Sequence, residues 1–332
     1  MAQTSVRVAI LYQALEPPVI NGVRKPKKPG GIMAFLSFHG SRSVLTLDLG
    51  YQDSGADIAY ALSSSHNLNI ITPTMNPIAE DDSNWCFPDT EEGIKTALDR
   101  GATHLWANTI LFASHPLQQS SAINSFEDKV KLVGQPPLMV EQYDDKEFVN
   151  ELLRRTGGFD MPRAWYIKEL DGQDGLQEQS KHLPYPVIAK PIRGRGSHGV
   201  KLCTCADEFV SHGRSLLSES PAFMVEEYLS GEEATITVMP PTEDKSCYWV
   251  LPPVTRFNHQ DGVAPYNGIV AVVSNSRAVI NSSDMTYEEV MRQCERAAAL
   301  LGVTAPIRID VRRYRPGSKF ALFDVNMKPV RL

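Results

Sequence analysis

The most informative part of this sequence is a pair of short segments near the C-terminus, RIDV at residues 308–311 and LFDVN at residues 322–326. Apolar and polar residues alternate in both segments, which is the pattern of a half-buried β-strand. Because strand side chains point alternately to opposite faces, the polar residues of each segment fall on one face. If the two strands pair, four polar side chains meet on a single patch: Arg308, Asp310, Asp324 and Asn326.

This patch has the chemistry of a magnesium site. Two carboxylates and an amide supply hard oxygen ligands, which Mg²⁺ accepts when it also binds phosphate oxygens. A neighbouring arginine would stabilise the charge on a phosphoryl group during its transfer. Ion pairs and hydrogen bonds between neighbouring strands explain the same residues equally well, since such pairs are common in sheets.

A glycine-rich segment upstream favours the magnesium interpretation. Residues 185–190, YPVIAK, predict an apolar strand that ends in a lysine, and residues 191–200, PIRGRGSHGV, predict a flexible loop. Backbone N–H groups of such a loop can approach phosphate oxygens closely. The loop leads into a returning strand, so it matches neither a Walker loop nor a Rossmann turn, both of which open a helix. An ordinary β-turn is the simpler alternative, and Lys190 at the end of the strand favours the functional one.

A third segment has the form of a nucleotide hinge. Residues 223–229 predict a strand that breaks at Ser230 and Gly231 and resumes over residues 233–238. Such a connection can present backbone N–H and C=O groups to an adenine edge, and Glu233 could accept hydrogen bonds from ribose hydroxyls. The alternative is an ordinary connection with solvated glutamates.

In the order of these segments, the chain resembles the ATP-grasp superfamily, and most closely its D-alanine–D-alanine ligase-like branch. The resemblance covers roughly residues 145–329 and, more loosely, the N-terminal third. It implies an α/β fold, α+β in part, with ATP between two subdomains. The implied parts are an N-terminal open parallel α/β domain at residues 1–133, a small central α+β subdomain at 134–220 and a C-terminal antiparallel-sheet subdomain at 221–332.

The resemblance also implies roles for the candidate site residues. Arg308, with Ser197 and Tyr266, would form the catalytic group, and Glu16 lies where ligases of this branch have an acid that positions the substrate amine. The nucleotide would be bound by residues before the C-terminal strands: Lys146, Lys190, Arg193, Gly194, Gly196, Ser197 and Gly199 at the phosphates, Glu226, Glu227 and Leu229 at adenine, and Glu233 at ribose. Two Mg²⁺ ions, with Mn²⁺ as an alternative, would be held by Asp310, Asp324 and Asn326.

The activity implied by the resemblance is that of an ATP-dependent, ADP-forming ligase that joins a carboxylate to an amine, or to a thiol, through an acyl phosphate. Its partners would be a small carboxylic acid and a small amine, and the resemblance leaves a homodimer open. Two features depart from the family: Asp324 stands where glutamate is usual, and Glu227 stands where lysine is usual. After Asn326 the sequence ends with MKPVRL, whereas the ligases continue with Ser-Pro-Gly and a further helix. The alternatives are therefore a catalytically inactive or truncated ATP-binding protein, or a phosphoryl transferase to a hydroxyl.

Length and composition are those of an ordinary globular chain. The 332 residues are 42% hydrophobic and 22% charged, with a net charge of -6. This charge gives no general attraction to nucleic acid or to an anionic membrane. No apolar run approaches the roughly 20 residues that span a bilayer, and the N-terminus lacks the layout of a signal peptide. We therefore expect a cytoplasmic protein that binds neither nucleic acid nor membrane.

The N-terminal third predicts strands and helices in alternation, which indicates a parallel sheet. The strand at residues 6–12 should lie beside those at 68–71 and 104–107. One helix should cover about residues 55–64 with Asp53 or Ser54 as its cap. Another should cover about 91–100, capped by Asp89 or Thr90 and ended by Gly101.

Two further segments of this third carry weaker expectations. Residues 32–49 are apolar without a clear period, and we expect a poorly ordered insertion there. His115, in a predicted loop, could act as an acid or base, but a single loop histidine is more often simply exposed.

Overall fold

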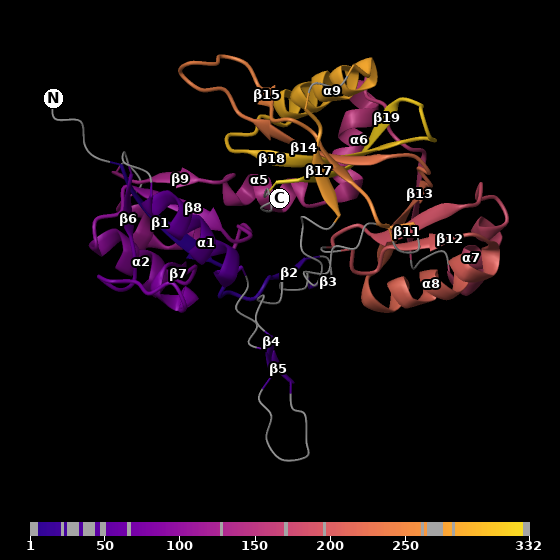
Figure 1. Cartoon of the computed structure of the whole chain (residues 1–332). Helices are drawn as coiled ribbons and strands as arrows, with labels where there is room; N and C mark the ends of the chain where they lie inside the picture. Colours follow the sequence, from indigo (N-terminus) through magenta and orange to yellow (C-terminus); the bar gives the residue numbers. More distant parts are fainter. Residues whose placement is uncertain are drawn as a thin grey trace. The chain divides into compact units, whose positions relative to one another are not determined.

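The computed structural model describes residues 6–20, 23–24, 33–35, 44–46, 51–64, 68–126, 129–168, 172–194, 197–259, 262–263, 275–280 and 283–327. The chain divides into two compact units, each described by itself below (Figure 1). The first consists mainly of Met1–Pro18 and Pro26–Glu141, and the second mainly of Val19–Lys25 and Gln142–Val330. The predicted division into three domains stays a prediction.

The first unit is built on a parallel sheet, as the sequence predicts. Its strand order is β6-β1-β8-β9, and β7 pairs with the end of β1. The chain thus leaves β1 for a strand on one side and returns to a strand on the other. The strands are β1 (Arg7–Tyr12), β6 (Asn69–Ile71), β7 (Phe87–Pro88), β8 (His104–Asn108) and β9 (Lys131–Val133).

The two longer helices of this unit start for different reasons: buried packing sets the start of one, and a side-chain cap sets the start of the other. α1 (Gln52–Ser63) starts three residues before the predicted position, and neither Asp53 nor Ser54 caps it. Its first residue follows Tyr51, a buried residue with φ of 67° whose carbonyl accepts from Gly55 N and from Asn108 Nδ2, both at 2.9 Å. Buried packing of Tyr51, which no capping pattern reveals, therefore sets the start of this helix.

The second helix, α2 (Glu91–Asp99), follows the capping rules. Thr90 accepts a hydrogen bond from Gly93 N at 3.2 Å, and Gly101 follows the helix with φ of 91°. Of the two predicted caps, Thr90 is therefore correct. The remaining helical segments of this part of the chain are η1 (Asp82–Asn84), α3 (Pro116–Gln119), α4 (Ser121–Asn124) and α5 (Pro137–Tyr143).

Short antiparallel pairs lie between β1 and α1. β2 (Val19–Ile20) pairs with β3 (Val23–Arg24), and β4 (Met33–Phe35) pairs with β5 (Val44–Thr46). The expectation of a poorly ordered insertion at residues 32–49 stays a prediction, and β4 and β5 are the parts of this range that the structure describes. The rest of residues 32–49 lies outside the described residues.

The second unit contains two antiparallel sheets. The smaller, here called the central sheet, has the order β10-β13-β11-β12 and is covered by α7 (Gly172–Ser180) and α8 (Ala206–Glu219). Phe209 of α8 and Phe223 of β13 are fully buried in the core between them. The strands of the central sheet are β10 (Ala164–Lys168), β11 (Val187–Pro191), β12 (Lys201–Cys203) and β13 (Ala222–Glu227).

The larger sheet, here called the C-terminal sheet, has the order β17-β16-β14-β18-β19, with β15 also paired to β14. α9 (Met285–Leu301) packs on it, capped by Asp284 and ended by Gly302 with φ of 64°. α6 (Lys146–Thr156) also contacts this sheet at β19. The strands are β14 (Glu233–Met239), β15 (Trp249–Val250), β16 (Val254–Arg256), β17 (Ser276–Ala278), β18 (Ile307–Arg313) and β19 (Phe320–Asn326).

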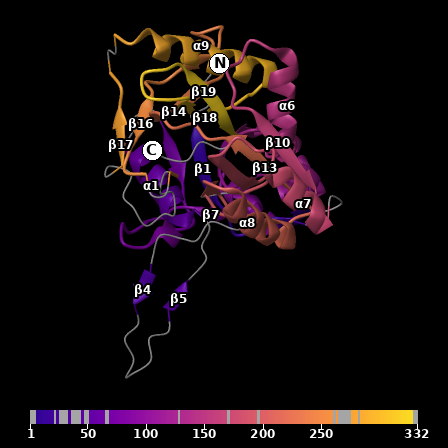
Figure 2. The same ribbon diagram turned by 90° about the vertical axis from the view of Figure 1, so that its right-hand side faces the viewer.

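Within the second unit, helices cover the outer side of each sheet. Figures 1 and 2 show α9 over the C-terminal sheet and α8 beside the central sheet, so that the other face of each sheet is turned toward its neighbour. Over residues 233–238 and 307–312 of β14 and β18, apolar side chains are fully buried at every second position, and polar side chains occupy the alternate positions. The polar face of the C-terminal sheet is the face that carries the candidate site.

Candidate active site

The two C-terminal strands pair as predicted and bring their polar residues together. β18 and β19 are antiparallel, with Arg308 opposite Asn326 and Asp310 opposite Asp324. Asn326 Nδ2 lies 3.3 Å from Asp310 Oδ2 and 3.3 Å from Asp324 Oδ2, so the two carboxylates meet at one point. Arg308 Nη2 donates to Asp310 Oδ2 at 3.0 Å.

A neighbouring strand fixes the orientation of one of these carboxylates. Thr235 of β14 lies opposite Asp310, and its Oγ1 donates to Asp310 Oδ1 at 2.8 Å. Thr235 is almost fully buried. Asp310 is therefore held on one oxygen by a threonine and on the other by Arg308 and Asn326.

Lys146 approaches the same carboxylates from α6. Asp145 caps this helix by accepting from Phe148 N at 3.0 Å, which places Lys146 as its first residue. Lys146 Nζ lies 3.3 Å from Asp324 Oδ1. The predicted first phosphate lysine therefore stands directly beside a predicted metal ligand.

Lys190 reaches the patch from the central sheet. Its Nζ lies 2.6 Å from Glu226 Oε2 and donates to the carbonyl of Phe323 at 3.2 Å. Because Phe323 immediately precedes Asp324, this lysine of β11 contacts the strand of the other sheet that carries a predicted metal ligand. Asn150 Nδ2 donates to the second oxygen of Glu226 at 3.2 Å.

The charges in this cluster shift one another's pKa values. Burial raises the pKa of Asp324, but the charges of Lys146, Lys190 and Arg308 outweigh burial and lower it below its usual range. For Asp310, burial outweighs the attraction of Arg308, and the pKa is raised. Burial acts against the charged form of Lys146, yet the nearby Asp324 and Asp144 raise its pKa. The shifts at Lys146 and Asp324 both favour the charged forms, so this pair is the one whose two charges the site stabilises.

The glycine-rich loop is fixed at both ends. Arg193 Nη2 lies 3.2 Å from Asp145 Oδ2, and Gly199 carbonyl accepts from His212 Nε2 at 2.9 Å. Gly199 has φ of 68°, and a Cβ there would lie 2.9 Å from Pro191. Gly194 meets nothing closer than 3.5 Å, Ser197 is exposed with φ of 59°, and Gly196 lies outside the described residues.

The predicted adenine hinge lies at the end of β13. Glu226 is buried against Lys190, whereas the next residue, Glu227, points to the opposite side of the strand and pairs with Arg163 Nε at 3.2 Å. Leu229 is buried two residues further on. The side chain of Glu226 is thus directed toward Lys190, the predicted second phosphate lysine, and that of Glu227 is directed to Arg163.

Glu233 begins β14, beyond the hinge. Its Oε2 lies 2.9 Å from His259 Nε2 and 3.6 Å from Arg312 Nη1. The predicted ribose acid is therefore paired with two cationic or proton-donating side chains. Tyr266, the third predicted catalytic residue, lies outside the described residues.

The donor set suits magnesium that is also bound to phosphate. Among the described residues, no group of three histidine, cysteine, aspartate or glutamate side chains is placed to hold a metal ion. The patch instead offers two carboxylates and one amide, with Asp310 already oriented by Thr235. Mg²⁺ in nucleotide sites commonly takes one or two carboxylates and completes its shell with phosphate oxygens and water. The residues present therefore fit such an ion.

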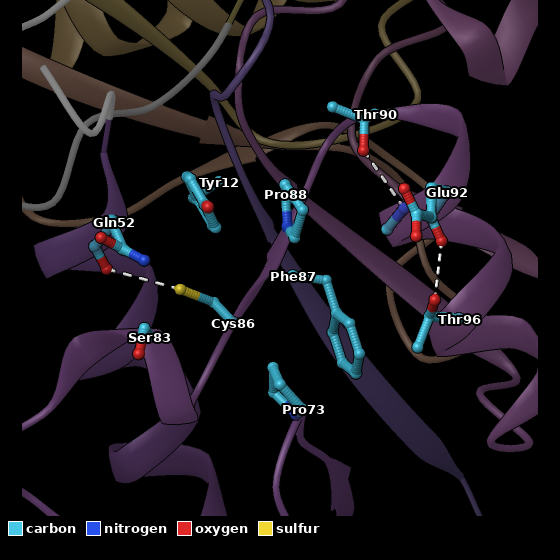
Figure 3. A pocket seen from close by; sticks show the side chains of 11 residues that line it. Tyr12, Gln52, Pro73, Ser83, Cys86, Phe87, Pro88, Thr90, Glu92 and Thr96 are labelled. Atoms are coloured by element: carbon cyan, nitrogen blue, oxygen red, sulfur yellow. Dashed lines mark hydrogen bonds between the residues drawn. The ribbon is translucent and has the colours of Figure 1, made fainter.

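The first unit contains a separate shallow pocket of about 380 Å³. Figure 3 shows Gln52 and Ser83 on one side of it, Glu92 and Thr96 on the other, and Tyr12 between them. It lies at the carboxyl end of β1, where open α/β sheets commonly bind ligands. The rest of its lining consists of Pro73, Cys86, Phe87, Pro88, Thr90 and Gly93.

His115 is buried, which corrects the expectation that it is an exposed loop residue. Only 4% of it is accessible, its Nδ1 accepts from Leu117 N at 3.2 Å, and its Nε2 lies 3.4 Å from Asp89 Oδ2. Asp89 also accepts from the backbone N–H groups of Ala14 and Leu15 at 2.8 and 2.9 Å. His115 thus caps α3 and supports an aspartate that anchors the loop after β1.

Comparisons with known proteins agree with this architecture. The fold, with two antiparallel sheets and lysines beside paired carboxylates, is that of an ATP-grasp protein. A family model described as the D-Ala–D-Ala ligase C-terminus matches residues 164–330, about half of the chain. The chain belongs to this D-Ala–D-Ala ligase-like family. A comparison with curated proteins gave no significant match.

Solved structures show the same fold at low sequence identity. The D-alanine–D-alanine ligase from Bacillus anthracis, complexed with ATP, has a TM-score of 0.57 and 14% identity, covering 98% of this chain and 87% of that chain. The VanG D-Ala:D-Ser ligase from Enterococcus faecalis has a TM-score of 0.63 and 12% identity, covering 98% and 91%. The biotin carboxylase domain of 2-oxoglutarate carboxylase from Hydrogenobacter thermophilus, solved with MgADP and bicarbonate, has a TM-score of 0.55 and 14% identity, covering 82% and 56%.

Sequence reasoning missed several residues of the site. Asn150 lies one helical turn after Lys146, and this spacing places both on one side of α6. Thr235 lies two residues after Glu233 and therefore on the same strand face. Both could have been found from periodicity, whereas nothing in the sequence indicates that His259 meets Glu233.

Within the described part of the chain, no helix is both long and apolar enough to cross a lipid bilayer.

Proposed function

We propose that the protein is an ATP-dependent ligase that joins a small carboxylic acid to an amine, or to a thiol, through an acyl phosphate. One observation carries this proposal: Lys146 and Lys190, from different elements, meet the strand that bears Asp324. Lysines beside carboxylates are the arrangement expected where phosphate oxygens and Mg²⁺ bind together. Family membership and the ATP- and MgADP-bound structural neighbours support the same nucleotide.

Magnesium would be held by Asp310, Asp324 and Asn326, and would supply Lewis-acid stabilisation of the phosphate oxygens. Thr235 and Arg308 already orient Asp310, which limits the reorganisation needed at that ligand. Lys146 and Lys190 would bind phosphate oxygens in addition to their present carboxylate neighbours. Two ions are the expectation from the family, and Mn²⁺ is the alternative metal.

In the proposed reaction, the substrate carboxylate attacks the γ-phosphorus in line. A bond forms between the carboxylate oxygen and phosphorus while the bond to the β–γ bridging oxygen breaks, giving an acyl phosphate and ADP. Arg308 would stabilise the charge of the transferring group, the kind of fixed electrostatic contribution that dominates phosphoryl transfer. The amine then attacks the acyl carbon, phosphate leaves and the amine loses a proton.

The glycine-rich loop would exclude water from the acyl phosphate. Its two ends are anchored at Arg193 and Gly199, so the segment between them is the part that would close over the phosphates. Ser197, Gly194 and Gly196 belong to this segment, and we propose that their backbone N–H groups bind phosphate oxygens. Tyr266 is proposed to complete the catalytic group, with Glu226, Glu227 and Leu229 at adenine and Glu233 at ribose.

Trapping with hydroxylamine tests the proposal. The protein is incubated with MgATP, hydroxylamine and a panel of small carboxylic acids and amino acids, D-alanine included, while ADP release and hydroxamate are measured. An acyl phosphate gives a hydroxamate, and its formation in step with ADP supports the ligase. ADP release with a phosphate ester and no hydroxamate would indicate transfer to a hydroxyl. MgADP binding without turnover on any acid would indicate an inactive nucleotide-binding protein.

A further inference from the structure

We propose that His259 is a positioning residue of the nucleotide site, which orients the Glu233 carboxylate toward the ribose hydroxyls of ATP. The inference rests on the proposed function, in which Glu233 binds ribose. It concerns the segment after β16, which the family resemblance does not assign to the nucleotide. His259 Nε2 lies 2.9 Å from Glu233 Oε2, and the two side chains are 19% and 10% exposed.

The direction of this hydrogen bond follows from its chemistry. An ionised carboxylate can only accept, so the ring nitrogen that faces Glu233 carries the hydrogen and donates it. A hydrogen bond to a charged acceptor is stronger than one between neutral groups. His259 therefore fixes the rotation of the Glu233 carboxylate rather than merely lying beside it.

Both neighbours of Glu233 engage the same oxygen. Arg312 Nη1 lies 3.6 Å from Oε2, the oxygen that His259 also contacts. Within the described part of the chain, Oε1 is therefore the oxygen that can accept from a ligand. A ribose presents two adjacent hydroxyls, and a carboxylate held in one rotamer can receive them without losing conformational freedom on binding.

Arg312 gives this arrangement a rigid support. Its guanidinium donates to Gly231 carbonyl at 3.2 Å, to Gly262 carbonyl at 2.7 Å and to Tyr228 Oη at 3.3 Å. Gly231 lies in the turn between hinge and β14, and Tyr228 lies in the hinge itself. One buried arginine thus connects the hinge, the ribose acid and the segment that carries His259.

The segment with His259 is held closely against the hinge. Gly262 has φ of 77°, and a Cβ there would lie 2.8 Å from Leu202 Cδ2 and 3.1 Å from Tyr228 Oη. The backbone at this point therefore touches the central sheet through Leu202 and binds the C-terminal sheet through Arg312. Gly262, three residues after His259, thus lies close to both sheets that border the proposed cleft.

The test compares two nucleotides that differ only in their ribose hydroxyls. Binding of MgADP and of magnesium 2′,3′-dideoxy-ADP is measured by calorimetry for the wild type, His259→Ala, His259→Gln and Glu233→Ala. We expect the wild type to bind MgADP at least about tenfold more tightly than the dideoxy analogue, the value of one charge-assisted hydrogen bond. In His259→Ala the ratio of the two affinities should fall to between one and a few, while the affinity for the dideoxy analogue stays unchanged. Glutamine can donate from its amide, so His259→Gln should restore part of the ratio.

A matched control uses another histidine–glutamate pair. His182, exposed just after α7, has its Nε2 3.3 Å from Glu178 Oε1, and His182→Ala should bind both nucleotides like the wild type. If His259→Ala does not fold, His259→Leu provides a second non-donating side chain of similar bulk. An unchanged ratio in the non-donating variant, or equal weakening of both nucleotides, would overturn the inference.

The wild type and Glu233→Ala separate this inference from the proposed function. A wild type that fails to bind MgADP contradicts the nucleotide site, and the inference falls with it. A wild type with the expected ratio that Glu233→Ala abolishes but His259→Ala retains leaves the nucleotide site intact and overturns only the role of His259.

Discussion

Lys190 shows how one side chain connects the two sheets of the second unit. It is 5% exposed, forms an ion pair with Glu226 of its own sheet and donates to the β19 backbone of the other sheet. A buried ion pair contributes little net stability because both charges are desolvated, but the removal of one partner is costly. Stability and nucleotide binding should therefore respond differently when the pair is removed in steps.

Lys190→Met should lower the free energy of unfolding by about 3–5 kcal/mol, because it leaves Glu226 charged and buried. The double variant with Glu226→Gln should recover most of this loss and still bind MgADP at least about tenfold more weakly than Glu226→Gln alone, since no cation meets the phosphate. Urea unfolding and calorimetry measure the two quantities. MgADP affinity equal to that of Glu226→Gln in a stable double variant would show that Lys190 does not bind the nucleotide.

A substitution at Thr235 tests whether this side chain orients Asp310, a proposed metal ligand. Thr235→Val keeps the shape of the side chain and removes the 2.8 Å hydrogen bond to Asp310. Residues that orient metal ligands typically change metal affinity by about 10–100-fold. We expect the Mg²⁺ concentration that gives half-maximal ADP binding to rise by about that factor. Thr255→Val, on the exposed side of β16, is the matched control, and an equal effect in both variants would argue against the assignment.

Among elements, α9 supports the face of the C-terminal sheet opposite the site. Asp284 caps it by accepting from Thr286 N at 2.9 Å and pairs with Arg313 Nη2 at 2.6 Å. Hydrogen bonds from Thr286, aided by the charge of Arg313, lower the pKa of Asp284. A depressed carboxyl pKa in the folded state stabilises the protein above the unfolded pKa of about 3.9, and this contribution is lost as the pH falls through the folded value.

Asp284→Ala should therefore cost about 0.5–2 kcal/mol of stability at pH 7, the range for losing an N-cap. The difference from the wild type should shrink as the pH falls below about 4, where the wild-type carboxyl also becomes neutral. Urea midpoints at several pH values measure it. A difference that stays constant down to pH 3 would mean that the Asp284 charge contributes nothing.

The packing at the end of the glycine-rich loop can be tested by comparing two glycines with positive φ. Gly199 and Gly317 both have positive φ, 68° and 73°, but only Gly199 has neighbours where a Cβ would lie. Gly317→Ala should cost about 1–2 kcal/mol through backbone strain alone. Gly199→Ala should cost about 1–3 kcal/mol more, because the methyl group would meet Pro191 and Leu216. Equal unfolding free energies for the two variants would contradict the tight packing at the loop end.

At the same scale, sequence patterns predicted elements with a strong local signal. The alternation around Asp310 and Asp324 gave the pairing of β18 with β19, and Thr90 with Gly101 marked both ends of α2. The start of α1 was missed because buried Tyr51, rather than a cap, sets it. His115 was missed because its partner Asp89 is remote in sequence, and burial that depends on a distant residue leaves no local pattern.

At the scale of the whole molecule, the site in the second unit depends on contacts between segments far apart in the chain. Lys146 meets Asp324 and Lys190 meets Phe323 across more than a hundred residues. The backbone of Asp160 adds two more such contacts. Its carbonyl accepts from Leu322 N at 2.8 Å, and its N–H donates to Gln293 at 2.7 Å. Sequence alone suggested these long-range contacts only through family resemblance, because spacing along the chain does not determine them.

A crystal structure of the full chain with a non-hydrolysable ATP analogue and Mg²⁺ tests the central claim most directly. The account predicts a triphosphate contacted by Lys146 and Lys190, with metal density bound by Asp310, Asp324 and Asn326 and the ribose at Glu233. A nucleotide bound elsewhere, or a triphosphate whose metal ions leave both aspartates in contact only with protein side chains, would contradict it.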